Sequence, residues 1–130
     1  MSINPDDAFF NFKKIQLDWK GLSEADTRSK MIDKIFTCCL GWSESDITRE
    51  PHVHEGFIDY IFDIDGMPRF IVEAKKQGIF FEVPLSLKGN KFKLNGPISK
   101  NPTIMKAIEQ AHRYCTEKGT HYGIISNGDQ

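Results

Sequence analysis

Apolar residues recur every three or four positions in two segments near the start of the chain, and this spacing predicts two amphipathic helices. The first is expected to begin after Asn4, because asparagine caps helices well and Pro5 fits the first helical position. It should end at Lys20-Gly21 and serve as a packing helix. Its apolar face consists of Phe9, Phe12, Ile15 and Trp19.

The second helix is predicted from Ser23 to Leu40, with a glycine directly after it. Counting back along its apolar face in steps of four passes Arg28 and reaches Glu24. An acidic residue in the first turn is favoured by the helix dipole alone, so Glu24 has an ordinary explanation. The alternative is that Glu24 points along the buried face toward carboxylates of a sheet. The apolar face consists of Ile32, Ile35, Phe36, Cys39 and Leu40.

Short apolar runs bounded by turn-forming residues predict four strands, and a third helical pattern lies before the last of them. This helix should run from about Thr103 to Lys118 and end at Gly119. Its buried stripe consists of Ile104, Ile108, Ala111 and Cys115. The order after the first helix is therefore helix, strand, strand, strand, helix, strand, which is typical of an α/β domain. The predicted strands cover Ile47–Glu50, Phe57–Phe62, Phe70–Lys76 and Tyr122–Ser126.

Two of these strands carry charged side chains in apolar surroundings. Glu73 and Lys75 are two residues apart and so point to the same face of their strand, and the preceding strand carries Asp59. Burying charges costs several kcal/mol per ion unless a partner offsets it, and a divalent metal together with a phosphate would be such a partner. A Glu-x-Lys pair on a strand is common by itself, so its meaning depends on the residues around it.

The turn between these two strands decides whether their charges meet. A two-residue turn at Asp65-Gly66 would place Asp59 on the face opposite the Glu73–Lys75 side chains. A three-residue loop, Ile64–Gly66, would pair Asp59 with Ile71 and place all three charged groups on one face. We therefore predict the three-residue loop, or an equivalent bulge.

The linker from residue 78 to residue 102 contains a second predicted hairpin, formed by Leu85–Lys88 and Lys91–Leu94 around Gly89-Asn90. Lys88, Lys91 and Lys93 fall on one face of it. Like charges opposite each other weaken a hairpin, whereas a phosphate backbone lying across them would turn the repulsion into attraction. The alternative is a solvated edge that lysines protect against aggregation.

Length, charge and cysteine content narrow the possible classes of protein. A chain of 130 residues with 39% hydrophobic residues suits one domain, and a net charge of -1 excludes a globally basic nucleic-acid binder but not a local basic patch. No run of about 18 apolar residues and no signal-peptide pattern occurs, so we expect a cytoplasmic protein. Cys38, Cys39 and Cys115 are expected to be reduced core residues. His52 and His54 could share a face and ligate zinc, but no further ligand stands at a matching spacing.

Four motifs follow one another along the chain: SEADTRSKMIDKIFTCCLGW, FIDYIF, FIVEAKK and QAHRY. In this order they resemble the PD-(D/E)xK nuclease superfamily, most closely the N-terminal nuclease domain of type I restriction enzyme R subunits and related defence proteins, and QAHRY is similar to a Q-x-x-x-Y element of that family. The resemblance covers about residues 22–128. It implies a restriction-endonuclease-like core of order α-β-β-β-α-β, with a mixed central sheet flanked by helices and here preceded by a packing helix over 1–21. Residues 1–130 would form a single nuclease domain of a longer protein, with 78–102 as an inserted basic hairpin.

The resemblance implies a role for each matching residue. Asp59 and Glu73 would ligate Mg²⁺, or Mn²⁺, with the carbonyl of Ala74 as a further ligand and Glu24 adding a ligand or positioning a water. Lys75 would orient or deprotonate the attacking water. Where the family has Pro-Asp, this chain has Ile58 before Asp59. The residues that would shape the site or contact the nucleic acid are Gln110, Tyr114, Lys76, Lys88, Lys91 and Lys93.

The expected function is metal-dependent hydrolysis of nucleic acid, as an endodeoxyribonuclease domain of a restriction or antiviral defence system. The expected nucleic-acid partner is DNA, and RNA is left open. Further domains of the same polypeptide or partner subunits are also expected, whereas binding to a membrane is not. Nothing in the chain has the G-x-x-x-x-G-K signature of a motor domain. The alternative is a catalytically silent module of the same fold that binds DNA or a partner protein. A third possibility is a zinc-dependent module that uses His52 and His54.

Overall fold

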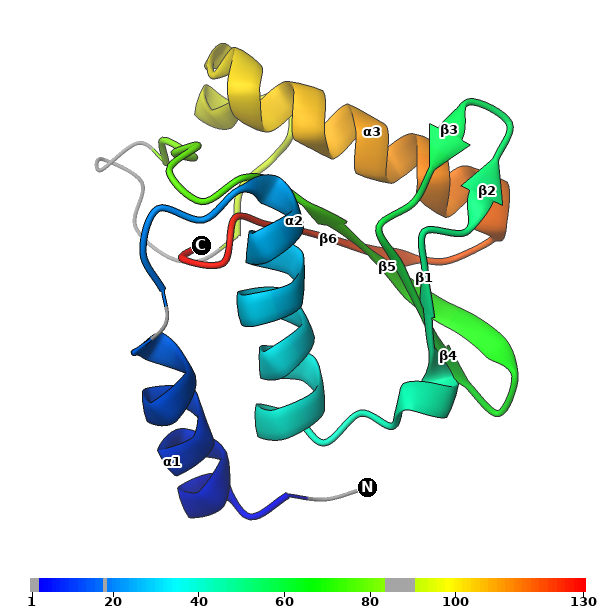
Figure 1. Cartoon of the computed structure of the whole chain (residues 1–130). Helices are drawn as coiled ribbons and strands as arrows, with labels where there is room; N and C mark the ends of the chain where they lie inside the picture. The colour runs from blue at the N-terminus through cyan, green and yellow to red at the C-terminus, as the bar shows by residue number, and fades with distance from the viewer. Residues whose placement is uncertain (1–2, 18, 84–90) are drawn as a thin grey trace.

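A mixed sheet of four strands forms the centre of the computed structural model, which describes residues 3–17, 19–83 and 91–130 (Figure 1). The strands lie in the order β1, β4, β5, β6. The pairs β1–β4 and β4–β5 are antiparallel, and the pair β5–β6 is parallel. The fold is mixed α/β, and the predicted order of the principal elements is confirmed. The strands cover Ile47–Arg49 (β1), Tyr60–Ile64 (β4), Met67–Ala74 (β5) and Tyr122–Ser126 (β6).

Helical segments cover both faces of this sheet (Figure 1). One face packs against a continuous helical segment that begins after Ser23, and the other face packs against α3. The helical segments are α1 (Pro5–Gln16), α2 (Glu24–Asp26), η1 (Thr27–Ile32), η2 (Ile35–Cys39) and α3 (Pro102–Lys118), with short turns η3 (Glu44–Asp46) and η4 (Pro97–Lys100).

The alternation of side chains along the strands assigns residues to these two faces. Phe62 and Val72 belong to the core cluster that contains Ile32 of η1. Ile61 and Ile71 belong to the cluster that contains α3 residues. The first cluster is largely aromatic, since Phe62 and Phe70 stack with their ring centroids 4.7 Å apart and Phe36 and Trp42 pack on them. Residues of β5 with odd numbers therefore face α3.

The helix that begins at Glu24 is wider than an α-helix over η1 and η2. In these stretches an amide bonds back to the fifth residue before it, as Leu40 does to the carbonyl of Ile35 at 2.9 Å. Thr27 and Met31 of this stretch are fully buried. Leu40, which the sequence predicts on the buried face, is 54% exposed, so that part of the prediction is wrong.

The first helix begins as predicted, with the side chain of Asn4 accepting a hydrogen bond from the amide of Asp6 at 2.8 Å. It ends at Gln16 rather than at Lys20, and none of its residues is fully buried. Phe9, predicted to pack inward, is 63% exposed. α1 lies along η2, where the amide of the Asn11 side chain donates to the carbonyl of Cys38.

The turn between β4 and β5 is not the three-residue loop, and the equivalent bulge that the sequence also predicted is present instead. Ile64 pairs with Met67, so the turn consists of Asp65 and Gly66, both with left-handed φ angles of 52° and 74°. A bulge beyond Phe62 then changes the register by one residue, so that Ile61 pairs with Ile71. The bulge therefore brings Asp59 to the same face as Glu73, which a two-residue turn alone would not do.

Two further strand boundaries differ from the prediction. The Phe57–Phe62 run is interrupted, because Phe57 pairs with His52 in a separate two-stranded ribbon of β2 (His52–Val53) and β3 (Gly56–Phe57). Asp59 therefore lies at a bend just before β4. β5 ends at Ala74, one residue before Lys75.

The predicted lysine hairpin falls partly on residues 84–90, including Lys88, which lie outside the described residues. Its second half, Lys91–Leu94, forms no strand. α3 ends as predicted, with Gly119 in the left-handed conformation, and its start is capped by Asn101, whose side chain accepts from the amide of Ile104. In the described part of the chain the three cysteines are free, and no helix is long and apolar enough to cross a membrane.

Candidate active site at the end of the central strands

Glu73 is a buried acid near the end of β5, and it lies on the face of the sheet that packs against α3. Its residue surface is only 4% exposed, and its Oε2 atom is buried without a hydrogen-bond partner among the residues that the structure describes. The pKa of Glu73 is raised to about 7, chiefly by burial and then by the charge of Asp59, while Lys75 acts in the opposite direction. A cation or a proton at this carboxylate would therefore be stabilised.

Asp59 is held close to Glu73 by contacts to two other elements. Its Oδ2 accepts a hydrogen bond from the amide of Ala74 at 2.7 Å, which ties the bend before β4 to the end of β5. Its Oδ1 accepts from Nη1 of Arg28 in η1 at 2.6 Å. The predicted meeting of Asp59 with the Glu73–Lys75 segment is therefore present, although it depends on a bulge and a bend rather than on a regular pair of strands.

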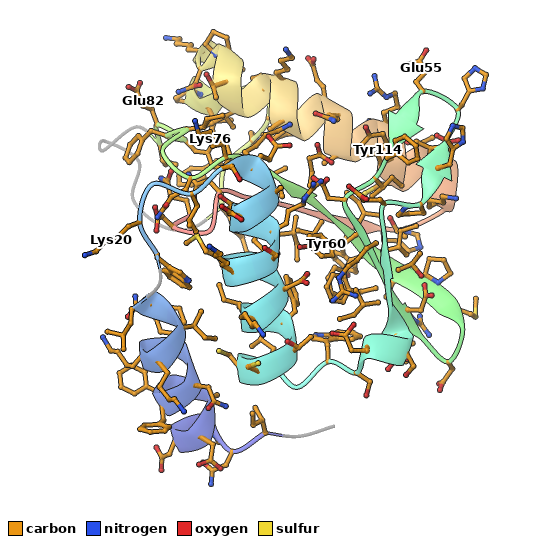
Figure 2. The ribbon with its side chains drawn as sticks, in the orientation of Figure 1. Lys20, Glu55, Tyr60, Lys76, Glu82 and Tyr114 are labelled. Atoms are coloured by element: carbon orange, nitrogen blue, oxygen red, sulfur yellow. The ribbon has the colours of Figure 1, made fainter. Side chains whose placement is uncertain are left out.

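Lys75 is directed into the site by one acid and one amide. Its Nζ donates to Oε1 of Glu73 at 3.2 Å and to Oε1 of Gln110 at 2.9 Å. The Nε2 of Gln110 in turn donates to the hydroxyl of Tyr114 at 3.1 Å. Tyr114 is buried on the side of α3 that faces the sheet (Figure 2). The sequence placed both α3 residues one turn apart and able to reach the site, and the geometry brings them there.

Two residues of η1 position the site, and the sequence did not single them out for this role. The buried hydroxyl of Thr27 donates to the carbonyl of Ser23 and accepts from the amide of Gln77, just beyond Lys75. Arg28 reaches Asp59 and also lies 3.4 Å from Glu50. The adjacent Thr-Arg pair after a capped, acidic helix start was the available sequence signal, whereas nothing local marked Glu50.

The remaining predicted site residues lie nearer to solvent. Glu24 is exposed in the first turn of α2, and its charge contributes the smallest of the effects that raise the pKa of Glu73. Lys76 follows Lys75 with an exposed side chain. Lys91 and Lys93 are exposed in the linker.

The donor atoms at Asp59 and Glu73 suit a hard divalent cation. Carboxylate oxygens are the preferred ligands of Mg²⁺, which keeps several waters and needs only one or two carboxylates from the protein. The buried, unpartnered Oε2 of Glu73 is the oxygen that such an ion would satisfy. Within residues 3–17, 19–83 and 91–130, no group of three or more His, Cys, Asp or Glu is placed to hold a metal. A two-carboxylate Mg²⁺ site therefore fits better than a zinc site, and His52 instead packs edge-on against Phe57.

No family model, no curated protein and no solved structure matches this chain. The function of the site is therefore argued from its own residues and geometry.

Proposed function

We propose that this chain is a metal-dependent nuclease of the PD-(D/E)xK type with a restriction-endonuclease-like core, similar to the nuclease domain of type I restriction enzyme R subunits. The observation that carries the proposal is the buried Oε2 of Glu73, which lies beside Asp59 and Lys75 and has no hydrogen-bond partner among the described residues. Keeping an unsatisfied acid in a buried position costs stability, and such groups concentrate at functional sites.

Asp59, Glu73 and the carbonyl of Ala74 are the proposed ligands of Mg²⁺ or Mn²⁺, with Glu24 adding a ligand or a bound water from the helix start. When bound, the ion supplies charge that holds the scissile phosphate and lowers the pKa of the attacking water. Hard oxygen donors favour these ions over zinc.

Lys75 is the proposed contact to the reacting phosphate and water. Its ammonium group is fixed between Glu73 and Gln110, so it enters the site in one orientation and can offset negative charge on the phosphate. Gln110 and Tyr114 act through Lys75 and are positioning residues, because the buried Tyr114 fixes the amide of Gln110.

DNA is the proposed substrate, in a restriction or antiviral defence system of the cytoplasm, together with further domains of the same polypeptide or partner subunits. The exposed Lys76, Lys91 and Lys93 are proposed to contact its phosphates, with Lys88 of the same linker. RNA presents the same phosphodiester chemistry, so both substrates belong in the test.

The decisive experiment incubates the purified protein with supercoiled plasmid, and separately with RNA, with and without Mg²⁺. Asp59→Ala, Glu73→Ala and Lys75→Ala should each abolish cleavage while the thermal unfolding transition persists, because each removes a group that contacts the ion or the phosphate. Lys106→Ala, an exposed lysine on α3, is the matched control and should cut normally. Mg²⁺-dependent cleavage that survives in any of the three variants would refute the role assigned to that residue.

A catalytically silent module of the same fold is the second candidate. It is favoured by one observation: both oxygens of Asp59 already accept hydrogen bonds, from Arg28 and from the amide of Ala74. Calorimetric titration with Mg²⁺ or Mn²⁺ separates the two candidates. The nuclease should bind weakly and lose this binding with Glu73→Ala, whereas the silent module should show no such heat.

A further inference from the structure

The guanidinium of Arg28 lies between two carboxylates of different burial. Nη1 is 2.6 Å from Oδ1 of Asp59, whose side chain is 11% exposed, and Nη2 is 3.4 Å from Oε1 of Glu50, whose side chain is 62% exposed. The shorter contact is thus made to the carboxylate that the proposed metal site needs. Arg28 therefore occupies, as a cation, one oxygen of that site.

Glu50 is held beside Asp59 by an uncommon backbone conformation. Its φ angle is 51°, in the left-handed region that non-glycine residues adopt rarely, and its amide donates to the carbonyl of Asp59 at 3.0 Å. This conformation at the end of β1 fixes the position from which its side chain meets Arg28. The outlier thus provides a second anionic partner for Arg28.

Space is available for the guanidinium to move between these partners. A cavity of about 210 Å³ lies against Arg28, Glu50, Asp59 and Tyr60, and the side chain of Arg28 is itself 25% exposed. Arg49 lines the same cavity but pairs with Asp33 and Glu44 instead. A matched arginine without contact to Asp59 is therefore available in the same chain.

We propose that Arg28 and a divalent cation compete for Asp59, and that Arg28 moves to Glu50 when the cation binds. Without a cation, Arg28 neutralises Asp59 and limits its repulsion with Glu73. With a cation bound to Asp59, the guanidinium is repelled from that oxygen, and Glu50 keeps it paired. The inference rests on the metal site of the proposed function but not on cleavage of a nucleic acid.

Calorimetric titration of the nucleic-acid-free protein with Mn²⁺ tests the exchange. Arg28→Gln should tighten Mn²⁺ binding about tenfold, because the competing cation is gone. Glu50→Gln should weaken binding several-fold while Arg28 is present and should have no effect in the Arg28→Gln background. Arg49→Gln and Glu44→Gln, which alter the neighbouring ion pair, should leave the affinity unchanged.

The double-variant cycle distinguishes an exchange of partners from the general field of two charges. Equal weakening by Glu50→Gln in both backgrounds, or no tightening by Arg28→Gln, overturns the inference while leaving the metal site intact. Arg28→Lys, which keeps the charge but loses the forked geometry, should bind Mn²⁺ with intermediate affinity and provides a second variant should Arg28→Gln unfold. Identical heats from the unaltered protein and Asp59→Asn would show that no ion binds at Asp59, and both proposals would then fall.

Discussion

At the scale of the residue, Glu73 combines three features that rarely occur together: deep burial, an unpartnered oxygen and an adjacent carboxylate. In the part of the chain that the structure describes, one oxygen of Glu73 is paired with the positive charge of Lys75 and the other has no partner. The residue is therefore destabilising when it is ionised and no cation is bound, which is the condition under which a site can bind a cation without first losing other contacts.

This imbalance predicts how stability depends on pH. The pKa of Glu73 in the folded protein, about 7, lies above its ordinary value of 4.5, so the folded state holds a proton that the unfolded state has lost between these values. The stabilising contribution is complete below about pH 4.5 and is lost as the pH rises through about 7. Its size is about 3 kcal/mol, from the pKa difference.

Glu73→Gln should therefore gain about 2 to 3 kcal/mol relative to the unaltered protein between pH 5 and pH 8.5, because the amide does not ionise. Urea unfolding at the two pH values, with a chelator present, measures this difference. Glu82→Gln, at an exposed position, is the control and should show no such change. A pH-independent effect of Glu73→Gln would mean that Glu73 stays ionised throughout.

At the scale of the element, the sequence was most informative where local chemistry sets a boundary. Asn4, Ser23 and Gly119 cap their helices as predicted, since capping depends on one side chain and the few residues next to it. The α3 residues that reach the site were also found, because helical spacing alone places them one turn apart.

The details that the sequence could not provide depend on packing between distant segments. The wide turns of η1 and η2 each insert one residue without a glycine or proline to mark them, and at the bulge beyond Phe62 the sequence signal is Pro68, which pairs with Asp63. The pairing of Phe57 with His52 likewise reflects a local ribbon that competes with continuation of β4. The need for Asp59 to meet Glu73 correctly predicted that both residues share one face. It did not decide between a three-residue loop and a bulge as the cause.

The burial and hydrogen bonds of Thr27 predict a specific role for this residue. Because Thr27 is fully buried and bonds both Ser23 and the amide of Gln77, Thr27→Val should destabilise the protein by about 1 to 3 kcal/mol and release the segment after Lys75. Urea unfolding and hydrogen exchange of the Gln77 amide measure the two effects. Thr37→Val is the matched control, because Thr37 also donates to the carbonyl four residues earlier but bonds nothing in the sheet.

At the scale of the whole molecule, the site exists only where three elements meet. Asp59 comes from the bend before β4, Glu73 from the end of β5 and Gln110 from α3, and each is joined to a neighbour by a hydrogen bond. The separation between α3 and the sheet therefore controls whether Lys75 keeps its second partner.

Gly123 of β6 controls this separation, since a Cβ atom there would lie 3.0 Å from Sγ of Cys115 and 3.6 Å from Cβ of Ala111 on α3. Gly123→Ala should thus push α3 outward, destabilise the protein by about 1 to 3 kcal/mol and weaken the contact between Lys75 and Gln110. Urea unfolding measures the first effect, and the amide resonances of the Gln110 side chain report the second. Adding Cys115→Ala removes the clashing sulfur and should restore both, whereas additive losses in the double variant would show that the close approach does not set the position of α3.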